Sequence, residues 1–286
     1  MTALVIAGLV VREASRRRLL LALVLLTLVV IALTAWGFSR LPYLTSGREP
    51  LTTEQVRLIA SQLLILVAFM FSFVLALSAV FVAAPAISGE VESGVALALL
   101  ARPLSRQAYV IGKWLGLAFL LVIYAGGAGA LELVAVRAVV DYSPPRPFEA
   151  FAFLATEGIV LLTLALALST RLSGMVGGVI ALVLFGIGWM GGIVGGIGQV
   201  FDNATITHVG TVTKLLLPTD GLWRGAVHAL EPTAVLVAAR GMPGPAVAAN
   251  PFFAAAPPPL PFLVWVALWI VAVLVVAVVS FRAREV

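Results

Sequence analysis

Long stretches without a single charged side chain constrain the fold of this chain more than any other feature. Four of them run for 21, 32, 18 and 30 residues, at 19–39, 58–89, 114–131 and 172–201, and a fifth ends at Phe281. About 20 helical residues cross a bilayer core of about 30 Å, so runs of this length are typical of transmembrane helices. With 62% hydrophobic and only 11% charged residues, the chain is predicted to be an all-α polytopic membrane protein.

One further apolar segment carries a single charge, Glu157, and is counted as a span because its length fits. The sequence therefore predicts six transmembrane helices in a single transmembrane domain that covers residues 1–286. The expected spans lie at about 19–39, 60–84, 114–136, 150–170, 174–200 and 260–281.

Basic residues beside the spans indicate the orientation. Basic residues form four groups, called clusters below: they precede the first span, lie between the second and third, lie between the fourth and fifth (Arg171 alone) and follow the sixth. With six spans all four clusters share one side, which the positive-inside rule makes cytoplasmic. We expect a multi-pass protein of the cytoplasmic membrane with both termini in the cytoplasm, an interfacial helix at 4–11 and an extracytoplasmic loop at 202–259. The net charge of +5 then reflects topology, and no nucleic-acid partner is expected.

The segment 87–113, "ISGEVESGVALALLARPLSRQAYVIGK", concentrates charge between two apolar runs. Glu90 and Glu92 near its start and Arg102 near a helix end would suit the dipole of a short helix, and apolar residues recur at i, i+4 and i+8. Pro103 would stop that helix and Ser105 would cap the third span. The pattern predicts a short amphipathic cytoplasmic helix, with a solvated linker as the alternative.

The same segment resembles the signature loop of type-two ATP-binding-cassette (ABC) exporter permeases. The match is carried by Glu90, Glu92, Gly94, Leu99, Leu100, Pro103, Ser105, Arg106, Gly112 and Lys113. Val95 departs from the pattern, where Thr is usual. The resemblance implies that this loop is a coupling helix, seated in a groove of a separate ATPase subunit. It assigns coupling to Glu90, Glu92, Gly94, Leu99, Pro103, Ser105, Arg106 and Lys113.

Partners follow from the same resemblance. ATP and magnesium are expected on a cytoplasmic ABC ATPase subunit, because the Gly112–Lys113 pair here lacks the hydroxyl residue and the earlier glycine of a P-loop. We expect this chain to be no enzyme and to bind no cofactor or metal of its own. A second permease chain, giving a homodimer or a heterodimer, and the lipid bilayer complete the expected partners.

Glycines in the fifth span form small-xxx-small series that allow close helix packing. They are Gly188, Gly191, Gly192, Gly195 and Gly196. Packing within the chain is one interpretation of this face. The other is a dimer seam or central path, which the similar permeases favour.

Three charges fall inside or near the predicted membrane region, where charge is costly and often functional. Glu157 is well inside its span, whereas Glu132 and Arg137 approach the outer surface. We expect Arg137 to reach towards one of the two glutamates, giving a structural ion pair, unless a carboxyl group is protonated. A role in substrate passage is the alternative.

Other functions remain open at this stage. The same three charges would suit an ion-coupled secondary transporter, and a membrane scaffold subunit is a further alternative. His208 and His228 lack a convincing carboxylate cluster for a membrane enzyme. His228 shares one face of a predicted amphipathic interfacial helix with Asp220 and Arg224.

Overall fold

The computed structural model describes residues 3–15, 18–46, 49–95, 105–239 and 249–284. Leu99 and Pro103 of the predicted coupling segment lie outside these ranges. In the described part, the chain is almost entirely helical, and a short antiparallel hairpin, β1 (Thr45–Ser46) with β2 (Glu49–Pro50), is its one sheet.

Six helices of the described chain are long and apolar enough to cross a bilayer, as the sequence predicted. The second of them continues into a shorter helix, α4 (Pro85–Glu92). The six are α2 (Arg18–Phe38), α3 (Thr53–Ala83), α6 (Arg106–Val140), α7 (Pro147–Ser169), α8 (Gly174–Val200) and α13 (Leu260–Arg282).

Helix α7 occupies the centre of the bundle, packed against α3, α4, α6, α8, α10 and α13. Its most apolar window is 56% buried, whereas the corresponding windows of α2 and α13 are 6% and 11% buried. A bilayer does not force apolar helices together, so extensive van der Waals contact is needed to place α7. The peripheral helices leave large apolar surfaces for lipid or another subunit.

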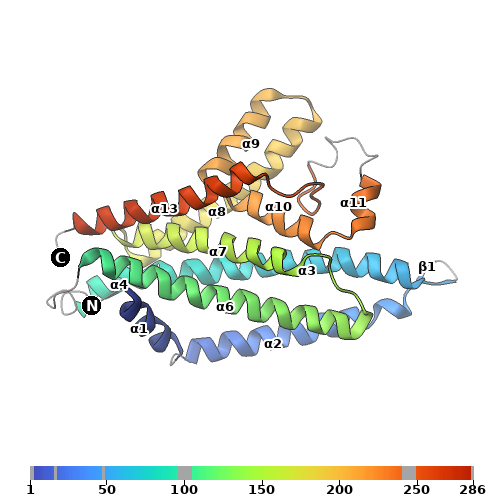
Figure 1. Ribbon diagram of the computed structural model, residues 1–286, viewed down its shortest axis with the longest axis horizontal. Coiled ribbons are helices and arrows are strands. Elements are labelled where there is room, and N and C mark those ends of the chain that lie inside the picture. The colour runs from blue at the N-terminus through green and yellow to red at the C-terminus, as the bar shows by residue number, and fades with distance from the viewer. Residues whose placement is uncertain (1–2, 16–17, 47–48, 96–104, 240–248, 285–286) are drawn as a thin grey trace.

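The two ends of the bundle carry different segments of the chain. Both chain termini lie at one end, beside α4, whereas the β1–β2 hairpin lies at the opposite end (Figure 1). Thr52 caps α3 in a capping box with Gln55: the Thr52 hydroxyl accepts from the Gln55 backbone N–H, and the Gln55 side chain accepts from the Thr52 backbone N–H. Pro85 stands at the first position of α4, where its missing N–H is tolerated and the long α3 helix is interrupted.

Helix α1 (Ala3–Ser15) precedes the first span and packs across α6. The helix predicted at 4–11 is therefore present, with Ile6 and Val10 buried and Leu4 and Leu9 exposed. One side of the helix is used by protein contact, and its exposed apolar residues are free to meet a membrane interface.

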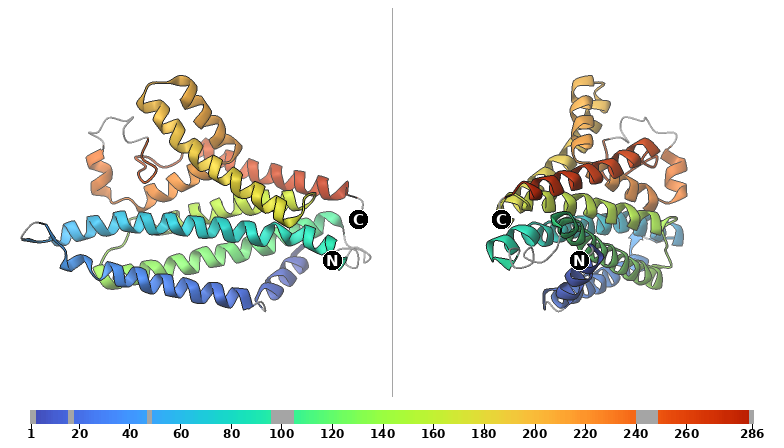
Figure 2. Two further views of the ribbon diagram at one scale, coloured as in Figure 1. Left: turned by 180° about the vertical axis from the view of Figure 1, so that it is seen from behind. Right: turned by 60° about the vertical axis from the view of Figure 1, so that its left-hand side comes forward.

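The segment after α8 folds back as helices. α9 (Ala204–Leu216) runs alongside α8, and the pair projects from the side of the bundle (Figure 2). α10 (Thr219–Leu230) then packs on α7, and α11 (Thr233–Ala239) follows. The predicted loop at 202–259 is thus largely helical up to residue 239.

Candidate coupling site and buried charges

Glu90 joins the last turn of α4 to α6. Its carboxylate accepts a hydrogen bond from the Tyr109 hydroxyl and forms an ion pair with Lys113. Tyr109 and Lys113 are four residues apart on α6, so both side chains leave one face of that helix. The ammonium also lies 5.8 Å from the centroid of the Tyr109 ring. With exposed fractions of 10% for Lys113 and 22% for Glu90, this pair is shielded from water, so the two helix ends are held together electrostatically.

The position of the acidic residues differs from the sequence prediction. Glu90 and Glu92 were expected to begin a helix, but α4 ends at Glu92 and the backbone turns at Gly94, whose φ is +76°. That left-handed conformation suits glycine because it has no Cβ. Acidic groups at a helix C-terminus are unfavourable to the dipole, and the Lys113 ammonium offsets this for Glu90. The expected helix start is therefore wrong.

Ser105 and Arg106 stabilise helix ends. The Ser105 hydroxyl accepts from the Ala108 N–H at 3.2 Å and caps α6, as predicted. Arg106 donates from Nη1 to the carbonyls of Phe281, Arg282 and Arg284 at 3.3, 2.9 and 2.6 Å. The C-terminal end of a helix carries partial negative charge on its carbonyls and attracts a cation, so Arg106 ties the start of α6 to the end of α13.

Gly112 is the point where α1 crosses α6. A Cβ at this position would lie 2.6 Å from the Ile6 Cβ and 2.7 Å from the Ala3 carbonyl oxygen. Only glycine allows the two backbones to approach this closely without a shift.

Glu92 is the exposed acid of the segment. Its side chain faces solvent, and it makes no ion pair within the described ranges of the chain. Ser93 beside it is exposed as well. Glu90 is already paired with residues of α6, whereas the Glu92 carboxylate remains exposed at this end of the bundle.

The glycine face of α8 packs inside the chain. The five glycines of the predicted small-residue series are all buried: Gly188, Gly191, Gly192, Gly195 and Gly196. A Cβ on Gly191 would collide with Thr213 of α9, one on Gly195 would lie 3.1 Å from the Gly210 Cα, and one on Gly192 would collide with Asp220. Packing within the chain therefore accounts for this face, and a contact with a second chain stays a prediction.

Asp220 is buried where α8, α9 and α10 meet. Its Oδ2 lies 3.3 Å from the Lys214 ammonium and 3.1 Å from Arg224 Nε. The sequence predicted this polar face of α10 as interfacial, but Asp220 is 1% exposed and His228 is 7% exposed. The predicted helix is present, but the prediction that its polar face is exposed is wrong, because Gly192 of α8, Lys214 of α9 and Ala254 lie against that face.

The two intramembrane glutamates have hydroxyl partners. Glu157 is buried at the centre of the bundle and accepts from the Ser72 hydroxyl at 2.9 Å. Glu132 pairs with the Thr34 hydroxyl at 3.0 Å. Arg137 is exposed, and neither carboxylate forms the expected ion pair with it in the described structure. Each glutamate is instead held by a serine or threonine from another helix.

The described residues contain no group of three or more His, Asp or Glu placed to hold a metal ion. His228 packs its Nδ1 2.9 Å from the carbonyl oxygen of Ala254, a contact that orients a buried ring.

Comparison with protein families decides the class. A model of the ABC-2 family transporter proteins matches residues 4–286, nearly the whole chain. The chain belongs to the ABC-2 transporter family. No curated protein matches the chain.

As an ABC-2 transporter protein, the chain is a permease, and the resemblance read from segment 87–113 is confirmed at the level of the family. Sequence reasoning missed Tyr109, although its spacing of four from Lys113 was a usable signal. It also missed the pairing of Asp220 with Lys214, because that contact depends on α9 folding back along α8.

Proposed function

We propose that this permease is the membrane subunit of an ATP-driven exporter and docks a separate ATPase at the end of the bundle that carries Glu92. Family membership supports the permease role. The grouping of both termini and α4 at this end supports the docking face, because the sequence places its basic clusters there. We place this end in the cytoplasm.

The contacts around Glu90 support a lever mechanism. α4 is clamped to α6 by Glu90, Tyr109 and Lys113, and α6 is clamped to α13 by Arg106. A force applied near Glu92 would therefore move three helix ends together rather than bend one loop. Closure of the ATPase would switch the permease between inward and outward access through such rigid-body motion.

ATP and magnesium belong to the partner in this proposal, which the lack of a P-loop in this sequence supports. A second permease chain would complete the transport path. The apolar surfaces left by α2 and α13 support an association with lipid or with that chain, since less than an eighth of each apolar window is buried. The glycines of α8 pack within the chain. We therefore expect the opposite, exposed face of α8 to contribute to any contact with a second permease chain.

Reversing the charge of Glu92 tests the docking face. Glu92→Arg should reach the membrane at the normal level, because the added positive charge agrees with a cytoplasmic position. Like charges brought together at a protein contact cost several kcal/mol, and about 1.4 kcal/mol already weakens binding tenfold. We expect the variant to lose co-purification of the ATPase and stimulation of its ATP hydrolysis.

The matched control is Glu49→Arg, which makes the same charge change on an exposed residue at the opposite end of the bundle. It should leave ATPase binding unchanged. Retention of both partner and ATP turnover by Glu92→Arg would refute the docking face. Substrate transport by the purified chain without any ATPase would instead favour an ion-coupled transporter.

A further inference from the structure

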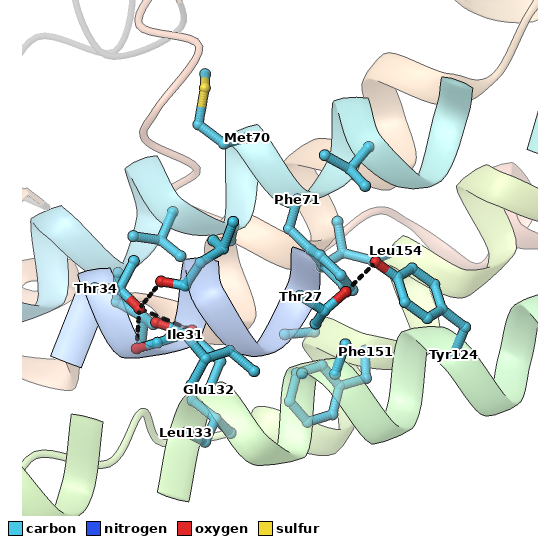
Figure 3. Close-up of a pocket in the computed structure, with 18 of the residues that line it drawn as sticks. Thr27, Ile31, Thr34, Met70, Phe71, Tyr124, Glu132, Leu133, Phe151 and Leu154 are labelled. Carbon is cyan, nitrogen blue, oxygen red and sulfur yellow. Dashed lines mark hydrogen bonds between the residues drawn. The ribbon is translucent and has the colours of Figure 1, made fainter. Parts of the chain in front are cut away.

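An apolar cavity of about 290 Å³ lies between α2, α3, α6 and α7 (Figure 3). It extends along α2 from Leu23 to Thr34, which corresponds to roughly 16 Å of helix at 1.5 Å per residue. Its shape is therefore long relative to its volume. Aliphatic and aromatic side chains, including Phe71, Phe151 and Leu154, form nearly all of its wall.

The cavity opens sideways between α2 and α3. A second hollow of about 310 Å³ adjoins it there and shares Thr34, Val67 and Met70 with it. The Met70 side chain at this junction is 58% exposed. Because both helices are membrane spans, this opening faces the hydrocarbon region, and a molecule dissolved in the bilayer reaches the cavity without crossing water.

Polar groups occur at two levels of this apolar wall. Tyr124 and Thr27 join their hydroxyls at 2.9 Å, which satisfies both groups. Nearer the outer end, Glu132 Oε2 pairs with Thr34, whereas its buried Oε1 has no hydrogen-bond partner in the described structure. An unpartnered carboxylate oxygen in an apolar site costs free energy that a bound donor would recover.

We propose that this cavity binds a long-chain amphiphile whose polar end is a hydrogen-bond-donating amine. The chain would lie along α2 and α3, and the amine would donate to Glu132. The terminal torsion of a glutamate is soft, so the carboxylate can rotate to face the cavity, and the hydrogen bond from the amine then replaces the one that Thr34 donates to Oε2. This binding does not depend on ATPase coupling.

The chemistry of the wall favours an amine over other head groups. Among the described residues that line the cavity, Glu132 is the one acid, and no Lys or Arg is present. A fatty acid would place its carboxylate against that of Glu132 in a medium of low dielectric constant, where like charges repel strongly. An ammonium there forms a charge-assisted hydrogen bond, about twice as strong as a neutral one.

Binding of dodecylamine to the purified full-length chain in phosphatidylcholine nanodiscs tests the proposal, with partition into empty nanodiscs subtracted. Glu132→Gln keeps the shape and removes the charge, so it should weaken binding at least tenfold. Ala128→Leu fills the cavity from α6 and should abolish binding. Glu149→Gln, an exposed change at the start of α7 outside the cavity, should bind as the parent chain does.

Adding phosphatidylethanolamine to the nanodiscs separates two sources of the amine. Competition with dodecylamine would identify a lipid head group as the occupant, and absence of competition a free amine; both agree with the site. Dodecanoic acid binding as tightly as the amine would overturn the proposal. So would unchanged amine binding in either cavity variant, provided that each variant unfolds at the temperature of the parent chain.

Discussion

Glu231 is the residue whose protonation is expected to change stability with pH. It is fully buried between α10 and α11, outside the spans, and its Oε2 lies 3.5 Å from Gln62 Nε2. Burial raises its pKa from 4.5 to about 7, against a smaller lowering by the Gln62 hydrogen bond. The folded chain therefore holds this proton more tightly than the unfolded chain. Its stabilising effect is complete below pH 4.5 and is lost as pH rises towards 7.

Glu231→Gln should consequently raise the midpoint of thermal unfolding at pH 8 and reduce its decline between pH 5 and pH 8. The amide keeps the volume and remains neutral, so the desolvation of a charge is removed. Unfolding followed in detergent at several pH values measures this. Glu49→Gln, at an exposed position, should leave the parent pH profile unchanged. A steeper decline in Glu231→Gln than in the parent chain would contradict the assignment.

The charged residues of segment 87–113 show what sequence could predict for single residues. Their types and spacing were sufficient to place Ser105 as a cap and to identify the family. The spacing of Tyr109 and Lys113 indicates that they share a face of α6, but not that this face meets Glu90. The contact of Arg106 with Phe281 joins residues 175 positions apart in the chain. Such contacts depend on how helices cross, which a local pattern does not contain.

Among the elements, the crossing of α1 and α6 offers the sharpest test of packing. A Cβ on Gly116 would lie 2.8 Å from the Val10 Cβ and 2.9 Å from the Ala7 carbonyl oxygen. Gly116→Ala should therefore push α1 away, even though alanine favours the helix by about 1 kcal/mol. We expect a lower unfolding temperature, and faster thiol labelling when the same chain carries Val10→Cys.

Gly127→Ala on the same helix is the control, because nothing lies within 4 Å of its added Cβ. It should keep or raise the unfolding temperature through helix propensity alone. Equal effects of the two alanines on the unfolding temperature and on labelling would show that α1 does not depend on this crossing.

Helix α10 marks the limit of prediction for elements. Periodicity and the Asp220, Arg224 and His228 spacing were enough to predict a helix, since they depend only on the 3.6-residue repeat. Its burial was not predictable, because a polar stripe indicates solvent unless other elements supply partners. Lys214 and α9 provide those partners here.

For the whole molecule, helix number was the most predictable property, since six apolar runs each match the thickness of a bilayer. The cavity beside Glu132 was not predictable, because it arises where α2 leans on α6 and leaves a space against α3. The orientation of the bundle in the membrane can be tested, because the basic clusters predict which end is cytoplasmic and the structure shows which elements lie at each end.

Single cysteines test this arrangement well, because the chain contains no native cysteine. Ser93 and Tyr43 are both exposed and lie at opposite ends of the bundle, beside α4 and before the β1–β2 hairpin (Figure 1). With the basic clusters in the cytoplasm, a membrane-impermeant maleimide should label Tyr43→Cys in intact cells and Ser93→Cys only after permeabilisation. Thr219→Cys, 1% exposed in the structure, should resist the reagent in both conditions. Labelling of Ser93→Cys in intact cells with protection of Tyr43→Cys would invert the topology and remove the proposed ATPase face from the cytoplasm.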